Sequence, residues 1–311
     1  MNEFKLENPH AIHFSGGRTS ALMLRRHLDA HGGKLPEGAV AIFCNTGKER
    51  PETLDFVERC SVEWDVPVVW LKYRYLPGEK PDDEDAVEEL PPVVREKVVK
   101  LLKATRKKPL GRHSFEVVNY ASASRDGEPF EQIIRARGFL PNVVARFCTV
   151  EMKIRTAQRY LKSLGWEHWT ASIGRRADEP RRVARLKGTN QHSREEPTAP
   201  LYCAGLTLAD VRAFWEASSF DLGLLPYEGN CDLCFLKGRD KITTIMRERP
   251  DLAAWWIEQE QKIKLSRSAR NDAFRADRPR YEVLLKQVQE QSLLEMFGDE
   301  PLIDCMCGGE E

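Results

Sequence analysis

The alternation of strand-like and helix-like segments in the first 71 residues is the feature that most limits the fold of this chain. Three short apolar runs, each of strand length, are separated by polar turns and by two segments with a helical pattern. The expected strands cover residues 11–14, 40–44 and 66–71, and the expected helices cover residues 21–30 and 52–64. Strands and helices that alternate at this spacing favour a parallel sheet with helices on both faces. The sequence therefore predicts an α/β fold.

Regular alternation stops between about residues 73 and 141. This stretch contains an acidic segment, 79–90, followed by a basic segment, 95–108, which we interpret as a solvated loop and an exposed helix face. We interpret the whole stretch as an insertion that could act as a lid. Helical and strand signals return over residues 149–164 and 168–173.

The last third of the chain is expected to be mostly helical. Thr207 is a good N-cap for one helix, and three more helical patterns follow over residues 241–248, 252–264 and 281–292. We expect Trp255 and Trp256 to belong to the core of this part. We therefore divide the chain into a nucleotide-binding domain, 1–195, and a helical, cysteine-bearing region, 196–311.

Charge and hydropathy exclude some classes of protein. The chain has 48 Lys and Arg against 48 Asp and Glu, so it carries no general basic coat for nucleic acid. No apolar run approaches the roughly 20 residues of a membrane-spanning helix. The N-terminal residues lack the basic and apolar regions of a secretory signal. We expect a cytoplasmic protein with no membrane partner.

A glycine-rich turn follows the first expected strand and opens the first expected helix. Two glycines allow backbone N–H groups to face an anion, and the helix N-terminus adds partial positive charge. The turn lacks the GK[ST] ending of a Walker loop, so it does not indicate an ordinary NTPase. The predicted phosphate-binding residues are Ser15, Gly16, Gly17, Arg18, Thr19 and Ser20.

Eight cysteines and few nearby histidines indicate that any metal site would be rich in thiolates. Cys231 and Cys234 form a CxxC half-site, and either Cys148 or the tail pair Cys305 and Cys307 could complete it. Reduced structural cysteines are the alternative.

Four ordered motifs resemble those of a known superfamily. The segment 15–21 is similar to the PP-loop of the adenine-nucleotide α-hydrolase-like superfamily. Three further segments, 45–58, 146–161 and 173–182, resemble its phosphoadenosine-phosphosulfate (PAPS) reductase branch. The resemblance implies a Rossmann-like sheet that binds ATP or another adenine nucleotide, with Mg²⁺, and holds the phosphates on the loop.

The resemblance also implies further contacts to the nucleotide. Arginines at the carboxyl end of a strand can fork onto phosphate oxygens, although Arg175, Arg176, Arg181 and Arg182 could instead form a surface ion-pair ladder with Asp178 and Glu179. The residues expected to contact the nucleotide beyond the loop are Asn45, Thr46, Lys48, Glu49, Gly174, Arg175 and Arg182.

For the cysteines, the resemblance implies a [4Fe–4S] cluster on Cys148, Cys231 and Cys234. Its fourth iron would take Cys305 or Cys307, or stay open to hold a sulfide. Phe147 stands where cluster-bearing reductases have a first cysteine. Zinc on the CxxC and CxC pairs is the alternative. The tail also lacks the Cys-Gly-x-His element of true reductases.

These observations favour an ATP-dependent sulfurtransferase that adenylates an acceptor and then delivers sulfur. The acceptor could be a nucleic acid or a small molecule, and a protein could donate the sulfur. One alternative is a sulfonucleotide reductase whose nucleophile is Cys305 or Cys307. Another is a nucleotide-binding accessory protein with a structural cluster or zinc. The sequence identifies no catalytic residue.

Overall fold

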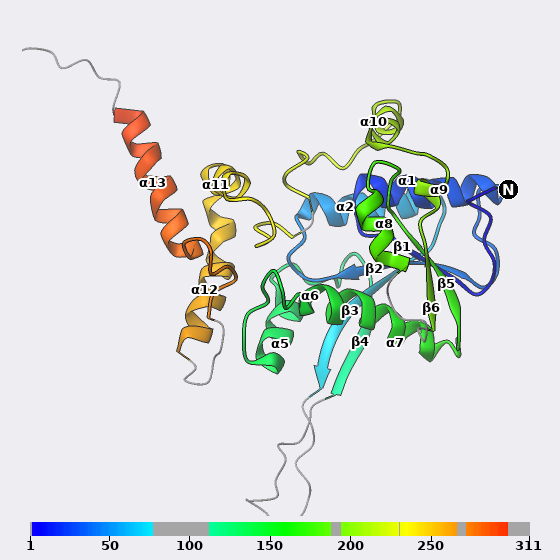
Figure 1. The fold of residues 1–311 in the computed structure, drawn as a ribbon, viewed down its shortest axis with the longest axis horizontal. Coiled ribbons are helices and arrows are strands. Elements are labelled where there is room, and N and C mark those ends of the chain that lie inside the picture. The colour runs from blue at the N-terminus through cyan, green and yellow to red at the C-terminus, as the bar shows by residue number, and fades with distance from the viewer. Residues whose placement is uncertain (1, 77–111, 188–193, 230, 266–271, 298–311) are drawn as a thin grey trace, which may run out of the picture.

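A computed structural model describes residues 2–76, 112–187, 194–229, 231–265 and 272–297. Its centre is a six-stranded sheet in the order β4-β3-β2-β1-β5-β6 (Figure 1). The strands are β1 (His10–His13), β2 (Ala39–Asn45), β3 (Val68–Leu76), β4 (Arg112–Val118), β5 (Trp169–Ile173) and β6 (Glu195–Thr198). All neighbours are parallel except β3 and β4. The predicted α/β class with a Rossmann-like sheet is confirmed.

The strand order reverses direction at β1. From β1 the chain moves outward on one side to β2 and β3, and later returns to place β5 on the other side of β1. In an open α/β sheet, such a reversal leaves a crevice outside the carboxyl ends of the two strands, where ligands bind. The topology therefore places the turn after β1 beside the turn after β5.

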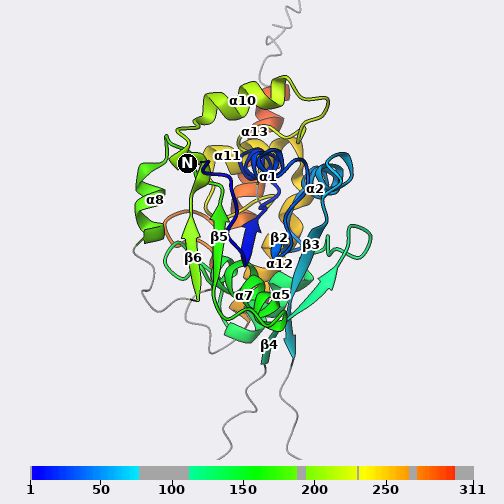
Figure 2. The same ribbon diagram turned by 90° about the vertical axis from the view of Figure 1, so that its right-hand side faces the viewer.

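Helices cover both faces because side chains alternate along the buried strands. Ile12 and Phe43 join one core with α1 (Arg18–Ala30) and α2 (Pro51–Glu63). Ala11 and Ile42 face the opposite core, which includes Leu161 of α7 (Thr156–Ser163). The two views agree on this layering, with α1 and α2 on one face and α7 on the other (Figure 1, Figure 2).

The stretch predicted to be an irregular insertion is partly regular. β3 continues to Leu76, and residues 112–118 form β4, an antiparallel edge strand paired with β3 along its length. The helix α5 (Glu128–Arg137) follows and buries Phe130, Ile133 and Ile134. The acidic and basic segments of the prediction, 79–90 and 95–108, lie outside the described residues.

The segment expected as one helix over 149–164 contains three elements. They are α6 (Phe147–Thr149), a π-helix η1 (Val150–Arg155) and α7. A π-helix widens the turn by one residue and frequently marks a functional position. The strand expected at residues 168–173 is β5.

The last strand and the helices after it extend the sheet unit beyond residue 195. β6 spans that position, and α8 (Pro180–Lys187) precedes it. Leu201 of α9 (Pro200–Cys203) and Trp215 of α10 (Leu208–Glu216) join the core of α1 and α2. As predicted, Thr207 precedes α10, and its N–H donates to the carboxylate of Asp210 at 2.7 Å.

The C-terminal helices form a third core, built around aromatic side chains. These helices are α11 (Arg239–Glu248), α12 (Ala253–Lys264) and α13 (Tyr281–Phe297), with a short 3₁₀ turn η2 (Pro250–Leu252). The ring of Trp256 stacks on Tyr281 at 5.3 Å and meets Phe274 edge-on at 4.9 Å. The expectation that Trp256 is core is confirmed. This core also includes residues of α5 and η1, which joins the C-terminal helices to the sheet unit.

Within the described part of the chain, no helix combines the length and the apolar character that crossing a membrane requires.

Candidate functional site

The turn after β1 is built on one glycine that cannot be replaced without strain. Gly16 has a φ of +76°, which favours glycine, and a Cβ there would lie 2.7 Å from Cγ2 of Thr53 on α2. Gly17 has an extended backbone, and a Cβ there would find only the Ser15 hydroxyl at 3.8 Å. Gly16 therefore fixes the turn, while Gly17 has room around it.

Serine hydroxyls fold this turn over the start of α1. The Ser20 hydroxyl accepts the N–H of Ser15 at 3.1 Å and donates to the carbonyl of Gly17 at 2.9 Å. No side chain caps the N-terminus of α1, so its first N–H groups are available to an anion. This arrangement, which we call the cradle, leaves N–H groups facing outward at the turn for which the sequence predicts phosphate binding.

The turn after β5 packs directly against this cradle. A Cβ on Gly174 would lie 3.2 Å from Cα of Ser20, so the two backbones are nearly in contact. Arg176 donates to the Thr19 hydroxyl at 3.3 Å. The turns after β1 and β5 thus form one surface at the position where the strand order reverses.

The arginines near this surface differ in how they are engaged. Arg182 pairs with Glu179, and Arg176 pairs with Asp178 at 2.9 Å. Among the described residues Arg175 makes no ion pair, and its Nε is buried without a hydrogen-bond partner. Burial, together with the like charge of Arg182, lowers the pKa of Arg175. An anionic ligand would relieve this uncompensated charge.

Two residues have a different place from the one expected. The guanidinium of Arg18 is held by Asp221 at 2.6 Å and by the carbonyl of Leu224 at 2.9 Å, so it ties α1 to the segment after α10. Arg176, which was not among the expected nucleotide contacts, is the arginine that contacts the phosphate loop. The residue before it is also an arginine, so only the direction of its side chain distinguishes it.

The loop after β2 is organised around a buried carboxylate. Glu49 accepts hydrogen bonds from the N–H and hydroxyl of Thr46, at 3.0 and 2.6 Å, and from the side-chain amide of Asn45 at 3.1 Å. These donors are therefore already occupied in the structure.

The same loop holds the CxxC segment. The ammonium of Lys48 lies 2.9 Å from the carboxylate of Asp232, and less than a tenth of either side chain is exposed. Arg50 pairs with Glu228 at 3.1 Å, and the backbone of Glu49 bridges to Cys231. Lys48 and Glu49, expected to contact the nucleotide, thus join the sheet to the C-terminal region.

Three of the predicted cysteines lie near one another, beside the loop after β2. The Cys231 thiol lies 3.6 Å from the Thr46 hydroxyl, and the thiols of Cys148 and Cys234 are close enough to influence each other electrostatically. Burial raises the pKa of the Cys148 and Cys231 thiols, and the charge of Cys234 adds to both shifts. Cys148, Cys231 and Cys234 therefore share one neighbourhood, as the sequence predicts.

A lysine that follows Cys148 in the sequence, Lys153, lies among these thiols. Burial opposes the charge of Lys153, but the neighbouring Cys231 thiol and Glu49 carboxylate outweigh it and raise the pKa of Lys153. The backbone carbonyl of Lys153 accepts a hydrogen bond from the Cys44 thiol at 3.5 Å. A charged ammonium in this place favours a thiolate over a thiol.

A fully buried carboxylate, that of Glu151, holds the π-helix η1, which also carries Lys153. Glu151 is held by Arg137 at 2.6 Å, by Arg155 at 2.5 Å and by Arg159 at 3.0 Å. Burial alone would raise the pKa of the Glu151 carboxyl, but Arg159 and Arg155, together with His113, hold it below its usual range. The four side chains fix the wide turn that carries Lys153 and follows Cys148.

The described cysteines do not form a metal site by themselves. Over the residues that the structure covers, no group of three or more His, Cys, Asp or Glu side chains converges closely enough to hold a metal ion. The six described cysteines are all free thiols. Cys305 and Cys307 lie outside the described residues. The thiols have suitable chemistry for iron or zinc, but their present spacing does not fit such an ion.

No family model matches the chain, and two of the proteins to which it is similar are a phage protein and a solved reductase. An uncharacterized nin region protein, ORF290, of Escherichia phage lambda is 27% identical over 245 residues, which cover 78% of this chain and 70% of that protein. A crystal structure of PAPS reductase from Candida auris in complex with phosphate covers 68% of this chain and 72% of that chain, with 14% identity and a TM-score of 0.31. These similarities do not assign the chain to a family.

Proposed function

We propose that this protein is an ATP-dependent enzyme of sulfur transfer that binds an adenine nucleotide at the crevice between β1 and β5. One observation carries the proposal: the uncapped start of α1 and the arginine-bearing turn after β5 meet at the point where the strand order reverses. Anions bind at such helix N-termini, and nucleotides bind at such crevices.

The residues of this crevice suit the polyphosphate end of ATP. N–H groups of α1 and the hydroxyl of Thr19 would face the phosphates, with Mg²⁺ as the counterion. Arg175 and Arg176 would neutralise the pyrophosphate that leaves when an acceptor oxygen attacks the α-phosphate. Preorganised donors of this kind stabilise charge that develops in the transition state.

The thiols support a role in sulfur transfer. They lie beyond the end of β2, one strand from the phosphate loop, and neighbouring strands are about 5 Å apart. The ammonium of Lys153 opposes the effect of burial on the pKa of Cys148 and Cys231, so it would stabilise the thiolate, and hence the sulfur nucleophile, once a base has taken the thiol proton. The acceptor and a sulfur-donor protein stay predictions, and the formal net charge of zero gives a nucleic-acid acceptor no general support.

Nucleotide titration tests the proposal directly. ATP should bind, and incubation with ATP should release pyrophosphate and, with water as the final acceptor, AMP; an Arg176→Ala variant should bind ATP about tenfold to a hundredfold more weakly. Release of sulfite from PAPS would instead indicate a sulfonucleotide reductase. Binding of ATP without turnover, under anaerobic conditions and with a sulfur donor present, would indicate an accessory protein.

The [4Fe–4S] cluster also stays a prediction. Iron and sulfide analysis of anaerobically purified protein tests it, and near 400 nm a cluster absorbs whereas zinc does not. Cys231→Ser should remove the iron, while Cys203→Ser, which alters an exposed thiol at the end of α9, should retain it. Zinc without iron or sulfide would contradict the cluster.

A further inference from the structure

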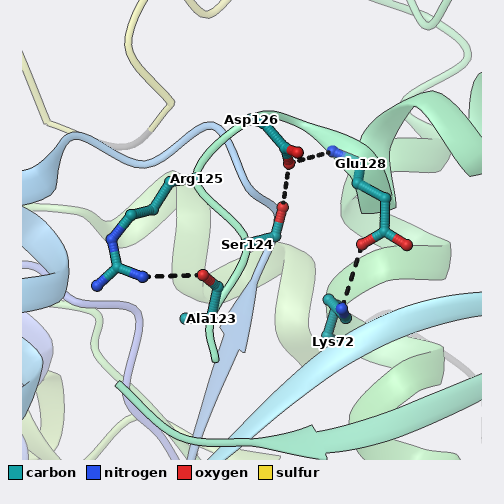
Figure 3. A pocket seen from close by; sticks show the side chains of 6 residues that line it. All are labelled: Lys72, Ala123, Ser124, Arg125, Asp126 and Glu128. Carbon is teal, nitrogen blue, oxygen red and sulfur yellow. Dashed lines mark hydrogen bonds and ion pairs between the residues drawn. The ribbon is translucent and has the colours of Figure 1, made fainter. Parts of the chain in front are cut away.

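A polar cavity of about 340 Å³ opens at the carboxyl edge of the sheet, beside β3 and two strands from β1. Its size falls within the range of small-molecule sites, roughly 300–1,000 Å³. Figure 3 shows its walls, which come from β3, the β4–α5 loop and the start of α5. The lining residues are Lys72, Ala123, Ser124, Arg125, Asp126 and Glu128.

The cavity is tied to the strand next to the phosphate loop. Lys72 is in register with Asn45, the last residue of β2. The Asn45 side chain donates to the carbonyl of Ser124 at 3.0 Å and accepts its N–H at 2.9 Å. Since neighbouring strands lie about 5 Å apart, the cavity is on the order of 10 Å from the loop after β1.

This position matches the path of a nucleotide whose phosphates lie on the loop. The ribose is joined to the α-phosphate through a single methylene group, so it must lie close to one side of the phosphates. On the β5 side are Arg175 and Arg176, which suit the polyphosphate. The ribose is then directed toward β2 and β3, where the cavity lies.

The charges of the lining cancel, so the cavity does not favour a further anion. Lys72 is engaged by Glu128 at 3.2 Å and by Glu116 at 3.6 Å. Arg125 donates to the carbonyls of Ala123 and Tyr120, both at 2.9 Å. In Figure 3 Arg125 lies on the opposite side of its loop from Lys72.

A carboxylate with free acceptor capacity remains. Asp126 accepts the Ser124 hydroxyl at 2.7 Å and the N–H of Glu128 at 3.1 Å (Figure 3). An ionised carboxylate has about four acceptor positions, so two remain for hydroxyl donors of a ligand. The Ser124 hydroxyl in turn holds the pKa of Asp126 below its usual range, so the group is charged at neutral pH.

We propose that this cavity binds the ribose of the nucleotide, that Asp126 accepts its hydroxyls, and that the enzyme therefore selects nucleotides with free 2′ and 3′ hydroxyls over 3′-phosphorylated ones. The proposal rests on the proposed function, since it takes the phosphates to lie on the loop after β1. A 3′-phosphate would bring a second anionic group against Asp126, while Lys72 is already paired with Glu128 and Glu116 and Arg125 lies on the other side of its loop.

Binding of a matched pair of nucleotides to the full-length protein tests the selection. AMP and adenosine 3′,5′-bisphosphate differ only in the 3′-phosphate, and calorimetry gives the dissociation constant of each. Repulsion between the carboxylate and a phosphate a few ångströms away should make the bisphosphate bind about tenfold more weakly, or worse. Equal or tighter binding of the bisphosphate would overturn the proposal.

Asp126→Asn then assigns the selection to this residue. Asparagine can still accept the Glu128 N–H, so the start of α5 is preserved, but the charge is lost. AMP should bind about tenfold more weakly, and the preference over the bisphosphate should shrink to about threefold or less. Ser124→Ala should weaken AMP binding in the same direction. Asp29→Asn, which removes an exposed carboxylate at the far end of α1, is the control and should change neither value.

The outcomes separate this inference from the proposed function. If Arg176→Ala weakens ATP binding while Asp126→Asn leaves the ratio of AMP to bisphosphate affinity unchanged, the phosphate site stands and the ribose assignment is wrong. If neither ATP nor AMP binds the wild-type protein, both proposals are wrong.

Discussion

The phosphate loop (residues 15–20) lies at the same edge of one sheet as the contact between residues 46–50 and the CxxC segment 231–234, which we call the CxxC junction. The two regions are built in opposite ways. At the phosphate loop, N–H groups of α1 are uncapped and Arg175 has no acidic partner among the described residues. At the CxxC junction, Lys48 forms an ion pair with Asp232, and the Glu49 carboxylate accepts a hydrogen bond from the Thr46 hydroxyl. The first region therefore has N–H donors and an arginine free to bind a ligand, whereas the charged groups of the second are already paired.

This difference separates residues that are free to bind a ligand from residues that hold the folded chain together. Donors and cations without partners are costly when partly buried, and they persist where a ligand satisfies them. Buried pairs that are already satisfied instead hold two parts of the chain together, and removing one partner leaves an uncompensated charge. Substitutions at the junction should therefore change stability, and those at the loop should change ligand affinity.

The largest effect is expected at the buried pair of the junction. Lys48→Ala should lower the free energy of unfolding by about 3–5 kcal/mol, because Asp232 would remain buried without a counterion. Denaturant titration measures this change. The control is Lys262→Ala, which breaks exposed pairs with Glu131 and Glu258 and should cost about 0–1 kcal/mol. Equal losses in the two variants would contradict the contrast between the regions.

The next effect concerns the carboxylate that holds η1. Glu151→Gln should cost about 1.5–3 kcal/mol, because it replaces hydrogen bonds between charged groups with neutral ones beside three arginines. The folded pKa of Glu151 is lowered, so its contribution is present above the unfolded value of about 4.3 and is lost as pH falls through the folded value. The wild type should therefore lose stability on acidification more steeply than the variant. Parallel pH profiles would exclude this role.

Affinity, not stability, should change at the arginine that contacts the loop. Arg176→Ala should weaken ATP binding by about tenfold to a hundredfold, which corresponds to a charge-assisted contact of roughly 1.5–3 kcal/mol. Arg182→Ala should change it by less than about threefold, because Arg182 pairs with Glu179 on the exposed surface. Calorimetry decides between them. A larger effect at Arg182 would return the site to the expectation from the sequence motif.

The smallest effect on stability should come from the glycines of the loop. Gly16→Ala forces a left-handed backbone and a close contact with Thr53, at a cost of about 1–2 kcal/mol, and should reduce ATP affinity. Gly17→Ala has room for its Cβ and should leave the free energy of unfolding unchanged within about 0.5 kcal/mol. If Gly17→Ala proved the more damaging change to stability, the turn would not be fixed as described.

Much of this fold follows from local patterns in the sequence. Apolar runs with turn residues between them predict β1, β2 and β3 and the helices after the first two, because periodicity and turn chemistry are properties of neighbouring residues. The phosphate turn could be recognised in the same way, since glycine and a following helix are local signals. The motif also placed Cys148, Cys231 and Cys234 together, and the fold agrees.

Only the tertiary structure decided what the side chains at the sheet edge do. Lys48 and Arg176 belong to equally plausible polar motifs, yet one is joined to Asp232, 184 positions away along the chain, and the other to Thr19, at a separation of 157. β4 was missed because an edge strand takes its pairing from β3 rather than from its own pattern. A sequence specifies which groups can ionise, donate or bend. Which of them remain available for a ligand depends on the partners that folding brings from distant segments, because each donor or charge so paired is no longer free to bind.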